Sequence, residues 1–315
     1  MRVDSTLSLD AWLEHRRELV EDALDRYLPA PPAVPPVLSA AMRYSLLAGG
    51  KRFRPALTLA AAEAVAATPS DIEFALPAAC ALEWIHTYSL VHDDLPAMDD
   101  DSLRRGRPTA HVVYGDGLAI LAGDGLLTEA FGLLAREPAS SDPGMIARKL
   151  RTLAVIAEAA GAAGMVGGQA VDLAAAGQVR PTHGESHAPL DAAGLQAMHA
   201  RKTGALIRAA AVAGAVMAGA TEARIAAIAR YAEDLGLAFQ IVDDILDVEA
   251  TSDELGKTAG KDAAAQKPTY PALFGLAGAR RLADAALARA LAALEGAGLS
   301  GYLPDIARWV VQRNR

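Results

Sequence analysis

The stretch of sequence that decides the fold is IARYAEDLGLAFQIVDDILD, which runs from Ile228 to Asp247. Its apolar residues recur at alternating steps of four and three, the spacing of one face of an α-helix, at Ile228, Ala232, Leu235, Phe239, Val242 and Leu246. A polar stripe runs beside them and contains Gln240, then Asp243 or Asp244, then Asp247. Because Asp243 and Asp247 are four residues apart, we expect their carboxylates on one face of the helix, roughly 6 Å apart. That spacing lets both carboxylates bind one metal cluster.

Helical periodicity of this kind recurs along almost the whole chain, and no segment shows convincing strand alternation. Aromatic residues make up only 5% of the chain, while alanine and leucine dominate it, which favours helix over strand. Hydrophobic residues amount to 52%, enough for a substantial core. Proline and glycine predict loops at Pro29–Pro36, Glu137–Gly144 and Gln178–Leu190. We therefore predict an all-α fold in which residues 1–315 form a single domain.

The composition also excludes several classes of protein. A formal charge of −8 argues against a nucleic-acid binder, which usually has a basic face. The single Cys80 excludes an internal disulfide and fits a reducing compartment. The amino terminus leads into a charged amphipathic stretch and predicts no signal peptide. No uncharged apolar run reaches the length of a membrane span, since even Ala205–Ala220 carries Arg208. We predict a cytoplasmic protein.

A second aspartate cluster follows the apolar stretch Tyr88–Val91 and reads Asp93-Asp94-Leu-Pro-Ala-Met-Asp99, with Arg104-Arg105-Gly106 soon after. We predict a helix that begins near Leu76 and places His86 two turns before Asp93 on the same face. On an ideal helix, Asp93 and Asp99 would lie out of line. Pro96 inside the helix would remove a hydrogen bond and kink the axis, so we expect a local bulge that returns Asp99 toward Asp93.

Both aspartate clusters suit a divalent metal ion. Each ends an apolar stretch, where an isolated carboxylate would be costly to desolvate. Mg²⁺ takes one or two protein carboxylates and completes its shell with water and substrate phosphate, and Mn²⁺ accepts the same ligands. One such cluster is readily explained as the solvated face of a helix. Two clusters, each behind an apolar run, are explained less readily in this way. An acidic chain with two such clusters and basic residues between them is expected to clamp a diphosphate.

The basic residues gather in three further clusters, which are Gly49-Gly50-Lys51-Arg52-Phe53-Arg54-Pro55, Arg201-Lys202-Thr203-Gly204 and Leu255-Gly256-Lys257-Thr258-Ala-Gly260-Lys261-Asp262. In the first, Gly50 allows close backbone approach, and Lys51, Arg52 and Arg54 offer cationic donors. Taken alone it is equally explained as a solvated turn, and it lacks the spacing of a P-loop. Two alternatives stay open for Gln169, which are a hydrogen bond that joins two helices and a functional role. His183 and His187 lie too close to Pro181 and Gly184 to predict a helical metal site.

These motifs occur in the order seen in trans-prenyltransferases, and the chain resembles a short-chain isoprenyl diphosphate synthase. The likeness covers nearly the whole sequence and is strongest to bacterial farnesyl diphosphate synthases. It rests on the segments Ile85-His-Thr-Tyr-Ser-Leu-Val-His-Asp-Asp-Leu-Pro-Ala-Met-Asp-Asp-Asp101 and Val311-Gln-Arg-Asn-Arg315, and on Phe239-Gln-Ile-Val-Asp-Asp-Ile-Leu-Asp247. The resemblance implies a helical bundle around a deep central cavity, an aspartate-rich motif on each side of its mouth, and a homodimer. The loop Gln178–Leu190 is longer than expected and departs from the family pattern.

The resemblance also implies roles for individual residues. Three Mg²⁺ ions would be bound by Asp93, Asp99 and Asp243, with support from Asp94, Asp244 and Asp247. Arg104, Lys202 and Lys257 would contact the allylic diphosphate, while isopentenyl diphosphate would lie on Lys51, Arg54, His86 and Arg105. Gly50, Gln169 and Tyr88 are further candidates for substrate binding. Thr203 and Gln240 would face the reacting carbon. The basic tail Arg313–Arg315 would close over the second diphosphate.

The implied reaction breaks an allylic C–O bond to give a carbocation and diphosphate, whose charge metal ions and cationic side chains stabilise. Tyr88 lies five residues before Asp93, roughly 7–8 Å along a helix, and in similar enzymes an aromatic residue here stops growth at fifteen carbons. We therefore predict a farnesyl diphosphate synthase. Ten- or twenty-carbon products remain alternatives, as do a terpene cyclase, which needs no isopentenyl site, and a regulatory subunit, which usually loses aspartates from one motif.

Overall fold

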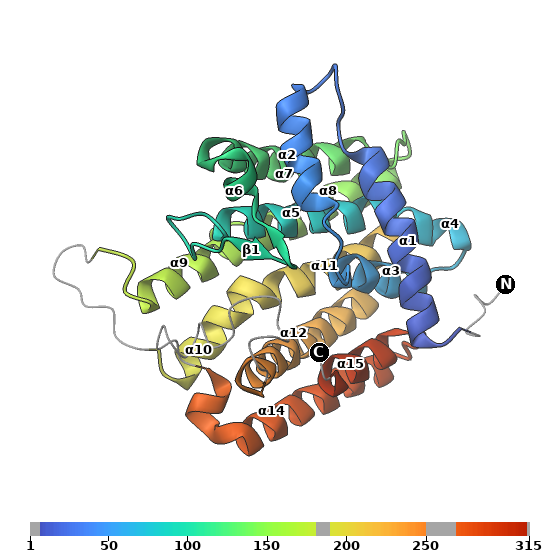
Figure 1. The fold of residues 1–315 in the computed structure, drawn as a ribbon. Helices are drawn as coiled ribbons and strands as arrows, with labels where there is room; N and C mark the ends of the chain where they lie inside the picture. The colour runs from blue at the N-terminus through green and yellow to red at the C-terminus, as the bar shows by residue number, and fades with distance from the viewer. Residues whose placement is uncertain (1–6, 181–189, 250–268, 314–315) are drawn as a thin grey trace. The chain divides into compact units, whose positions relative to one another are not determined.

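Figure 1 shows a chain built of helices, so the all-α prediction is confirmed. The computed structural model describes residues 7–180, 190–249 and 269–313. Within these ranges the only strands are β1 (Leu103–Arg104) and β2 (Arg107–Pro108), which pair as a short antiparallel hairpin. The chain forms two compact units: unit 1 is Met1–Ala154 with Ala210–Ala220, and unit 2 is Val155–Ala209 with Thr221–Arg315. That the whole chain acts as one domain stays a prediction.

The helices of unit 1 are α1 (Leu9–Tyr27), α2 (Pro36–Leu46), α3 (Phe53–Val65), α4 (Pro69–Glu73), α5 (Leu76–Asp93), α6 (Ala110–Tyr114) and α7 (Asp116–Arg136). Two helices, α8 (Pro143–Ala160) and α11 (Ala205–Met217), contribute residues to both units. Unit 2 contains α9 (Met165–Ala175), α10 (Ala192–His199), the π-helical turn η1 (Ala200–Gly204), α12 (Glu222–Glu249), α14 (Tyr270–Glu295) and α15 (Leu303–Gln312). The first two predicted loops lie between α1 and α2 and between α7 and α8, as expected. The third includes residues 181–189, which are outside the described ranges.

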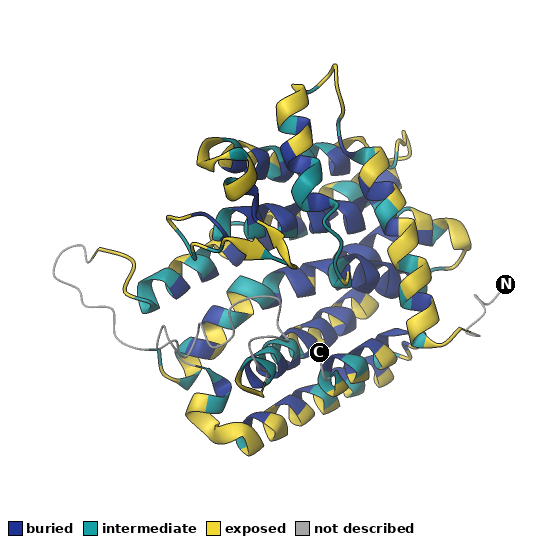
Figure 2. Ribbon diagram, viewed as in Figure 1, coloured by how far each residue is buried: buried dark blue, intermediate teal, exposed yellow. Residues whose placement is uncertain are grey.

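Helix α5 is the core helix of unit 1 and begins at Leu76, as predicted. Every residue from Pro77 to Ile85 is buried, and Figure 2 shows this helix largely in the colour of buried residues. The small side chains from Ala78 to Ala81 let neighbouring helices approach closely, and α3 and α7 pack against α5. A helix that is apolar on all sides must be covered on all sides, so its neighbours hold α5 rigidly. The first aspartate cluster lies at the carboxyl end of this rigid helix.

Arg52 is part of this core and is not available to a substrate. Its side chain is 1% exposed and donates to Glu83 of α5 at 2.8 Å, to Glu21 of α1 at 2.7 Å and to the carbonyl of Leu46 at 2.7 Å. Arg52 also has a φ of 48°, in the left-handed region. The expectation that Arg52 offers a cationic donor to a ligand is therefore wrong, because its guanidinium balances a buried carboxylate.

Unit 2 is organised by the long helix α12, whose predicted apolar stripe is confirmed. Ile228, Ala232, Leu235 and Val242 are buried, while Phe239 and Leu246 at the end of the stripe are partly exposed. Helix α14 packs along α12 through buried alanines at steps of four and three, which are Ala279, Ala283, Ala286 and Ala290. The hydroxyl of Tyr231 donates to the carbonyl of Leu303 at 2.8 Å and joins α12 to α15.

Two helical stretches, Asp116–Arg136 and Pro143–Ala175, are long and apolar enough to cross a membrane by length and composition. Of the residues in the most apolar segment of each stretch, 39% are buried in the first stretch and 33% in the second. The first stretch is α7, which packs on α5 and α2. Length and hydropathy alone do not separate such core helices from membrane spans.

We predict that Arg52→Met lowers the free energy of unfolding by about 3–5 kcal/mol, because it leaves the Glu83 carboxylate buried without its cation. Chemical denaturation followed by circular dichroism measures this loss. The control is Arg17→Met, which removes an arginine from an exposed pair with Glu14 and should have little effect. Equal stability of the two variants would contradict a structural role for Arg52.

Candidate functional site

The first aspartate cluster lies where α5 ends and the backbone turns back on itself. The N–H of Asp99 donates to the carbonyl of Asp93 at 2.9 Å, and the N–H of Asp101 donates to the carbonyl of Asp94 at 3.1 Å. The predicted return of Asp99 toward Asp93 is therefore seen in the backbone. Its cause differs from the prediction, because α5 ends at Asp93 and Pro96 lies in the following turn, not inside the helix. Asp93 and Asp99 are both partly exposed.

Asp94 and Arg104 form an ion pair within this cluster. The Asp94 side chain is 5% exposed, and Arg104 donates to its two oxygens at distances of 2.5 to 3.0 Å. Burial raises the pKa of Asp94, and the contact with Arg104 opposes that shift. Both residues were predicted to act on metal or substrate. The structure pairs them with each other and so fixes the β1–β2 hairpin to the end of α5.

The structure brings together several residues predicted to bind isopentenyl diphosphate. Arg105 donates to the carbonyl of Gly49, and its guanidinium lies over Gly50, where a Cβ atom would be 2.7 Å from Cζ. Burial lowers the pKa of His86 well below its ordinary value, and the positive charges of Arg54 and Arg105 lower it further. His86 is therefore neutral near pH 7, beside two guanidinium groups. Gly50 is needed because Arg105 occupies the space of a side chain.

Tyr88 is 9% exposed on α5 and lies edge-on to His92, with ring centroids 5.1 Å apart. His92 in turn packs on α7 at Gly123, where a Cβ would be 2.2 Å from Nε2, and Nε2–H donates to the carbonyl of Ile120 at 3.1 Å. Tyr88 is thus a fixed aromatic side chain below Asp93. What it does to chain length stays a prediction.

In the second aspartate cluster, Asp244 is 6% exposed and both its oxygens are used. It accepts from the backbone N–H of Tyr270 at 2.9 Å and from the side-chain amide of Gln240 at 2.9 Å. These bonds hold the start of α14 against α12 and fix Gln240. Asp243 and Asp247 are partly exposed on α12, and Asp243 accepts from Arg313. The three aspartates of this motif therefore have different surroundings.

Lys202 and Thr203 lie in the π-helical turn η1, which packs tightly on α9. A Cβ on Gly168 would be 2.3 Å from the backbone nitrogen of Lys202, so only glycine fits there. One turn further along α9, Asp172 accepts from the Lys202 ammonium at 2.6 Å and is 6% exposed. Asp172 was not identified from the sequence. Its spacing of four from Gly168 was the signal that both face η1.

Four polar side chains in unit 2 have buried atoms with no hydrogen-bond partner among the described residues, and one of these atoms is Nε of Arg313. Both polar atoms of the Gln169 amide, Nδ1 of His199 and the hydroxyl of Tyr270 are such atoms. The interhelical hydrogen bond considered for Gln169 is therefore not seen. Burial lowers the pKa of His199 to about 4, so its imidazole is neutral at pH 7. Buried polar atoms without partners commonly mark sites that a ligand or water completes.

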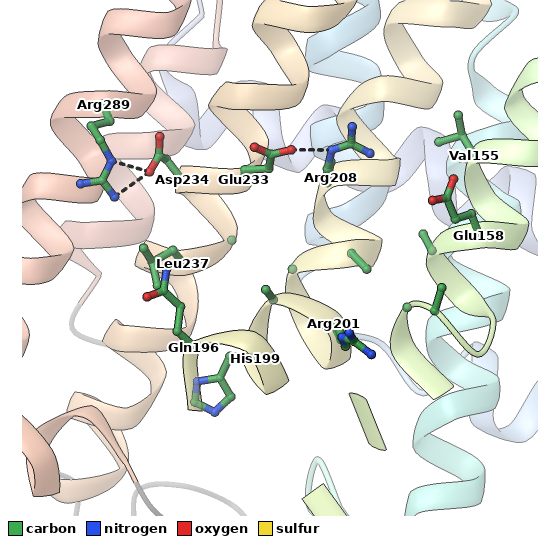
Figure 3. A pocket seen from close by; sticks show the side chains of 17 residues that line it. Val155, Glu158, Gln196, His199, Arg201, Arg208, Glu233, Asp234, Leu237 and Arg289 are labelled. Carbon is green, nitrogen blue, oxygen red and sulfur yellow. Dashed lines mark hydrogen bonds and ion pairs between the residues drawn. The ribbon is translucent and has the colours of Figure 1, made fainter. Parts of the chain in front are cut away.

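Unit 2 also contains a cavity of about 640 Å³ between α8, α10, η1, α11, α12 and α14. Figure 3 shows the ion pairs Arg208–Glu233 and Arg289–Asp234 along one side of it, with Gln196, His199 and Arg201 on the other. None of the site residues predicted from the sequence lines this cavity. It is therefore not the diphosphate site that the motifs predict.

Some predicted residues lie outside the described ranges. Lys257 falls within residues 250–268, and His183 and His187 fall within residues 181–189. Asn314 and Arg315 of the basic tail are likewise outside. The roles predicted for these residues stay predictions.

The donor chemistry of both clusters fits Mg²⁺. In each cluster the first and last aspartates are partly exposed, which are Asp93 and Asp99 in unit 1, and Asp243 and Asp247 in unit 2. Among the described residues, no three histidine, cysteine or acidic side chains form a ready-made metal cage. Mg²⁺ does not need one, because it takes one or two carboxylates and completes its octahedral shell with water and substrate phosphate. Two carboxylates in each cluster meet that requirement.

The model of the polyprenyl synthetase family matches residues 35–295. The chain belongs to this family. Its members are head-to-tail prenyltransferases, and short-chain trans-prenyl synthases are among the relatives.

Individual relatives match most of the chain but differ in the product they are named for. A geranylgeranyl diphosphate synthase from Cyanophora paradoxa is 45% identical over 274 residues, which cover 87% of this chain and 86% of that protein. A farnesyl diphosphate synthase from Geobacillus stearothermophilus is also 45% identical over 274 residues, with 87% of each chain covered. The crystal structure of an FPP/GFPP synthase from Zymomonas mobilis aligns over 99% of both chains with a TM-score of 0.78 and 35% identity. The family is therefore clear, and these names leave the product open.

We predict that Asp172→Asn lowers kcat/KM for prenyl transfer about 10- to 100-fold, because a charge-assisted hydrogen bond of roughly 1.5–3 kcal/mol no longer holds the Lys202 ammonium. Steady-state kinetics with varied allylic substrate measure the change. Asp305→Asn, which breaks an exposed pair with Arg308, is the control and should not alter the rate. Unchanged kinetics in Asp172→Asn would mean that the backbone of η1 alone positions Lys202.

Proposed function

We propose that this protein is a Mg²⁺-dependent farnesyl diphosphate synthase that condenses dimethylallyl and then geranyl diphosphate with isopentenyl diphosphate. The observation that carries the proposal is that two aspartate-rich segments each keep a pair of partly exposed carboxylates, Asp93 with Asp99 and Asp243 with Asp247. Three bound Mg²⁺ ions, or Mn²⁺ in their place, would supply electrostatic stabilisation of the departing diphosphate. The relatives named for prenyl diphosphate synthesis support the prenyl-transfer chemistry, and they differ in the product they are named for.

The chain's own cations divide between the two diphosphates in this proposal. Lys202, held by Asp172, and Arg104, held by Asp94, contact the allylic diphosphate together with Lys257. Their acidic partners keep both cations in place before substrate arrives. Isopentenyl diphosphate binds at Lys51, Arg54 and Arg105 in this proposal, and Gly50 leaves room for the Arg105 guanidinium.

Neutral His86 has a specific use at the isopentenyl site. Burial and the neighbouring Arg54 and Arg105 hold its pKa low, so it adds a hydrogen-bond donor without adding charge. Gln169, whose buried amide has no hydrogen-bond partner in the described part of the chain, is a further donor for substrate in this proposal. A protonated His86 would add a further positive charge to the arginines that bind this diphosphate. The neutral imidazole avoids the additional repulsion.

The reaction then proceeds by rearranging two electron pairs. The allylic C–O bond breaks and its electron pair leaves with diphosphate, whose negative charge is met by Lys202 and Arg104. The double bond of isopentenyl diphosphate forms the new C–C bond with the allylic carbon, and a proton passes to the departing diphosphate. Thr203 and Gln240 face the reacting carbon, where the bond from Gln240 to Asp244 keeps the amide in one orientation.

Two other classes fit the chain less well. A terpene cyclase needs no isopentenyl site, whereas unit 1 gathers Gly50, Arg54, His86 and Arg105. A regulatory subunit usually lacks aspartates in one motif, and both motifs are complete here. Geranyl and geranylgeranyl diphosphate remain alternative products of the same chemistry.

We further propose that the enzyme is a cytoplasmic homodimer. Unit 1 exposes large apolar side chains close together in sequence, Val112 and Val113 on α6 and Ile120 and Leu121 on α7, each 42 to 56% exposed. A second copy of this chain would cover them. Contiguous apolar patches on a protein surface commonly mark such interfaces.

The experiment that tests the function is product analysis by mass spectrometry, using purified protein, Mg²⁺, labelled isopentenyl diphosphate and each allylic starter separately. A fifteen-carbon diphosphate is the expected product. A ten- or twenty-carbon product would keep the chemistry and replace the farnesyl assignment. No condensation with any starter, or none without a co-purifying partner, would favour the cyclase or the regulatory subunit.

We predict that Tyr88→Ala shifts the main product from fifteen to twenty or more carbons, because removal of the ring opens space below Asp93. The matched control is Tyr88→Phe, which keeps the ring against His92 and should keep the fifteen-carbon product. Chromatography of the dephosphorylated products measures both. An unchanged distribution in Tyr88→Ala would mean that this ring only packs in the core.

A further inference from the structure

Arg313 follows the last residue of α15, and its guanidinium is fixed on the second aspartate cluster. The side chain is only 5% exposed. The guanidinium carbon lies 4.1 Å from the centroid of the Phe239 ring. One terminal nitrogen donates to the carbonyl of Phe239 at 3.3 Å and to the carboxylate of Asp243. Arg313 is therefore held by three separate contacts with α12, all within unit 2.

The geometry of α12 explains why arginine suits this place. Phe239 and Asp243 are four residues apart, so the ring and the carboxylate lie on one face of the helix. A planar guanidinium can stack on the ring and reach the carboxylate at the same time, which a lysine ammonium does less well. The charge of Asp243 is thus met by an arginine from the end of the described chain.

The second aspartate of the motif is held in a different way. Asp244 is buried and accepts from a backbone N–H and from Gln240, so its partners cannot leave without opening α14 or moving α12. Asp243 is 45% exposed, and among the described residues Arg313, beyond the end of α15, forms an ion pair with it through its side chain. That partner can leave by a rotation of its own side chain and of the chain end.

We propose that Arg313 is a removable counter-ion of Asp243, and that a metal ion binding to this carboxylate displaces the guanidinium and releases the chain end. The inference rests on the proposed metal role of Asp243. A guanidinium and a divalent cation repel each other at one carboxylate, so each lowers the affinity of the other. The coupling is reciprocal: removing the arginine strengthens metal binding, and adding metal frees the arginine.

The first arm of the test measures Mn²⁺ affinity of the full-length, substrate-free protein by the loss of the free-ion electron paramagnetic resonance signal. We expect Arg313→Gln to bind Mn²⁺ about 3- to 30-fold more tightly than the wild type, the range of a partly buried ion pair. The matched control, Arg308→Gln, removes an exposed arginine of α15 and should leave the affinity unchanged. Structural damage would weaken metal binding, so a gain is diagnostic. Unchanged or weaker binding in Arg313→Gln overturns the proposal.

The second arm reads the freedom of Arg313 directly, because trypsin must take this side chain into its own pocket to cut the bond before Asn314. We expect Mn²⁺ with inorganic diphosphate to speed this cut at least fivefold, while the cut after Arg308 does not change. In Asp243→Asn the cut after Arg313 should be fast without metal. Equal rates with and without metal in the wild type overturn the proposal.

The two arms separate this inference from the function on which it rests. If Asp243→Asn binds Mn²⁺ as tightly as the wild type, the metal role of Asp243 is wrong, and the counter-ion proposal is overturned with it. If Asp243→Asn binds Mn²⁺ more weakly but Arg313→Gln matches the wild type, only the counter-ion proposal is wrong.

Discussion

Compensation of buried carboxylates is the constraint on which the rest of this structure depends. An anion drawn into a core without a partner costs several kcal/mol, so each such group needs a cation or several hydrogen-bond donors. Glu83 has Arg52, Asp94 has Arg104, and Asp172 has Lys202. Asp244 accepts from a backbone N–H and from a side-chain amide. These partners also join elements that are distant in the sequence.

The same constraint gives the two aspartate motifs a common internal order. In each one the middle aspartate, Asp94 or Asp244, is buried and compensated, while the aspartates on either side of it are partly exposed. Adjacent residues of a helix point about 100° apart, so one of two neighbouring aspartates faces the core when the other faces outward. The buried member then anchors the motif, and the exposed members are left at the surface where water and phosphate oxygens can complete a metal shell.

Much of the fold followed from local patterns. The apolar stripe from Ile228 to Val242 specified α12, and the start of α5 at Leu76 followed from the apolar run behind it. The motifs also identified residues that influence one another in unit 1, since Arg105 lies on Gly50, and the charges of Arg54 and Arg105 help to lower the pKa of His86. Two local inferences were wrong. Arg52 looked like its basic neighbours, and Pro96 looked like a kink inside a helix. The environment of Arg52 was decided by partners far along the chain, and that of Pro96 by the backbone hydrogen bonds of a turn.

The sequence by itself determined the helical class, the helix carrying each aspartate motif, and the kinds of side chain available for a diphosphate and its metal ions. These depend on periodicity and residue chemistry, which are properties of short stretches of chain. Only the tertiary structure decided which charges are already paired. The contacts of Lys202 with Asp172 and of Arg313 with Asp243 join residues 30 and 70 positions apart. No spacing rule predicts such pairs, because the partner of a charge is set by which helices pack together and by how much water their packing excludes.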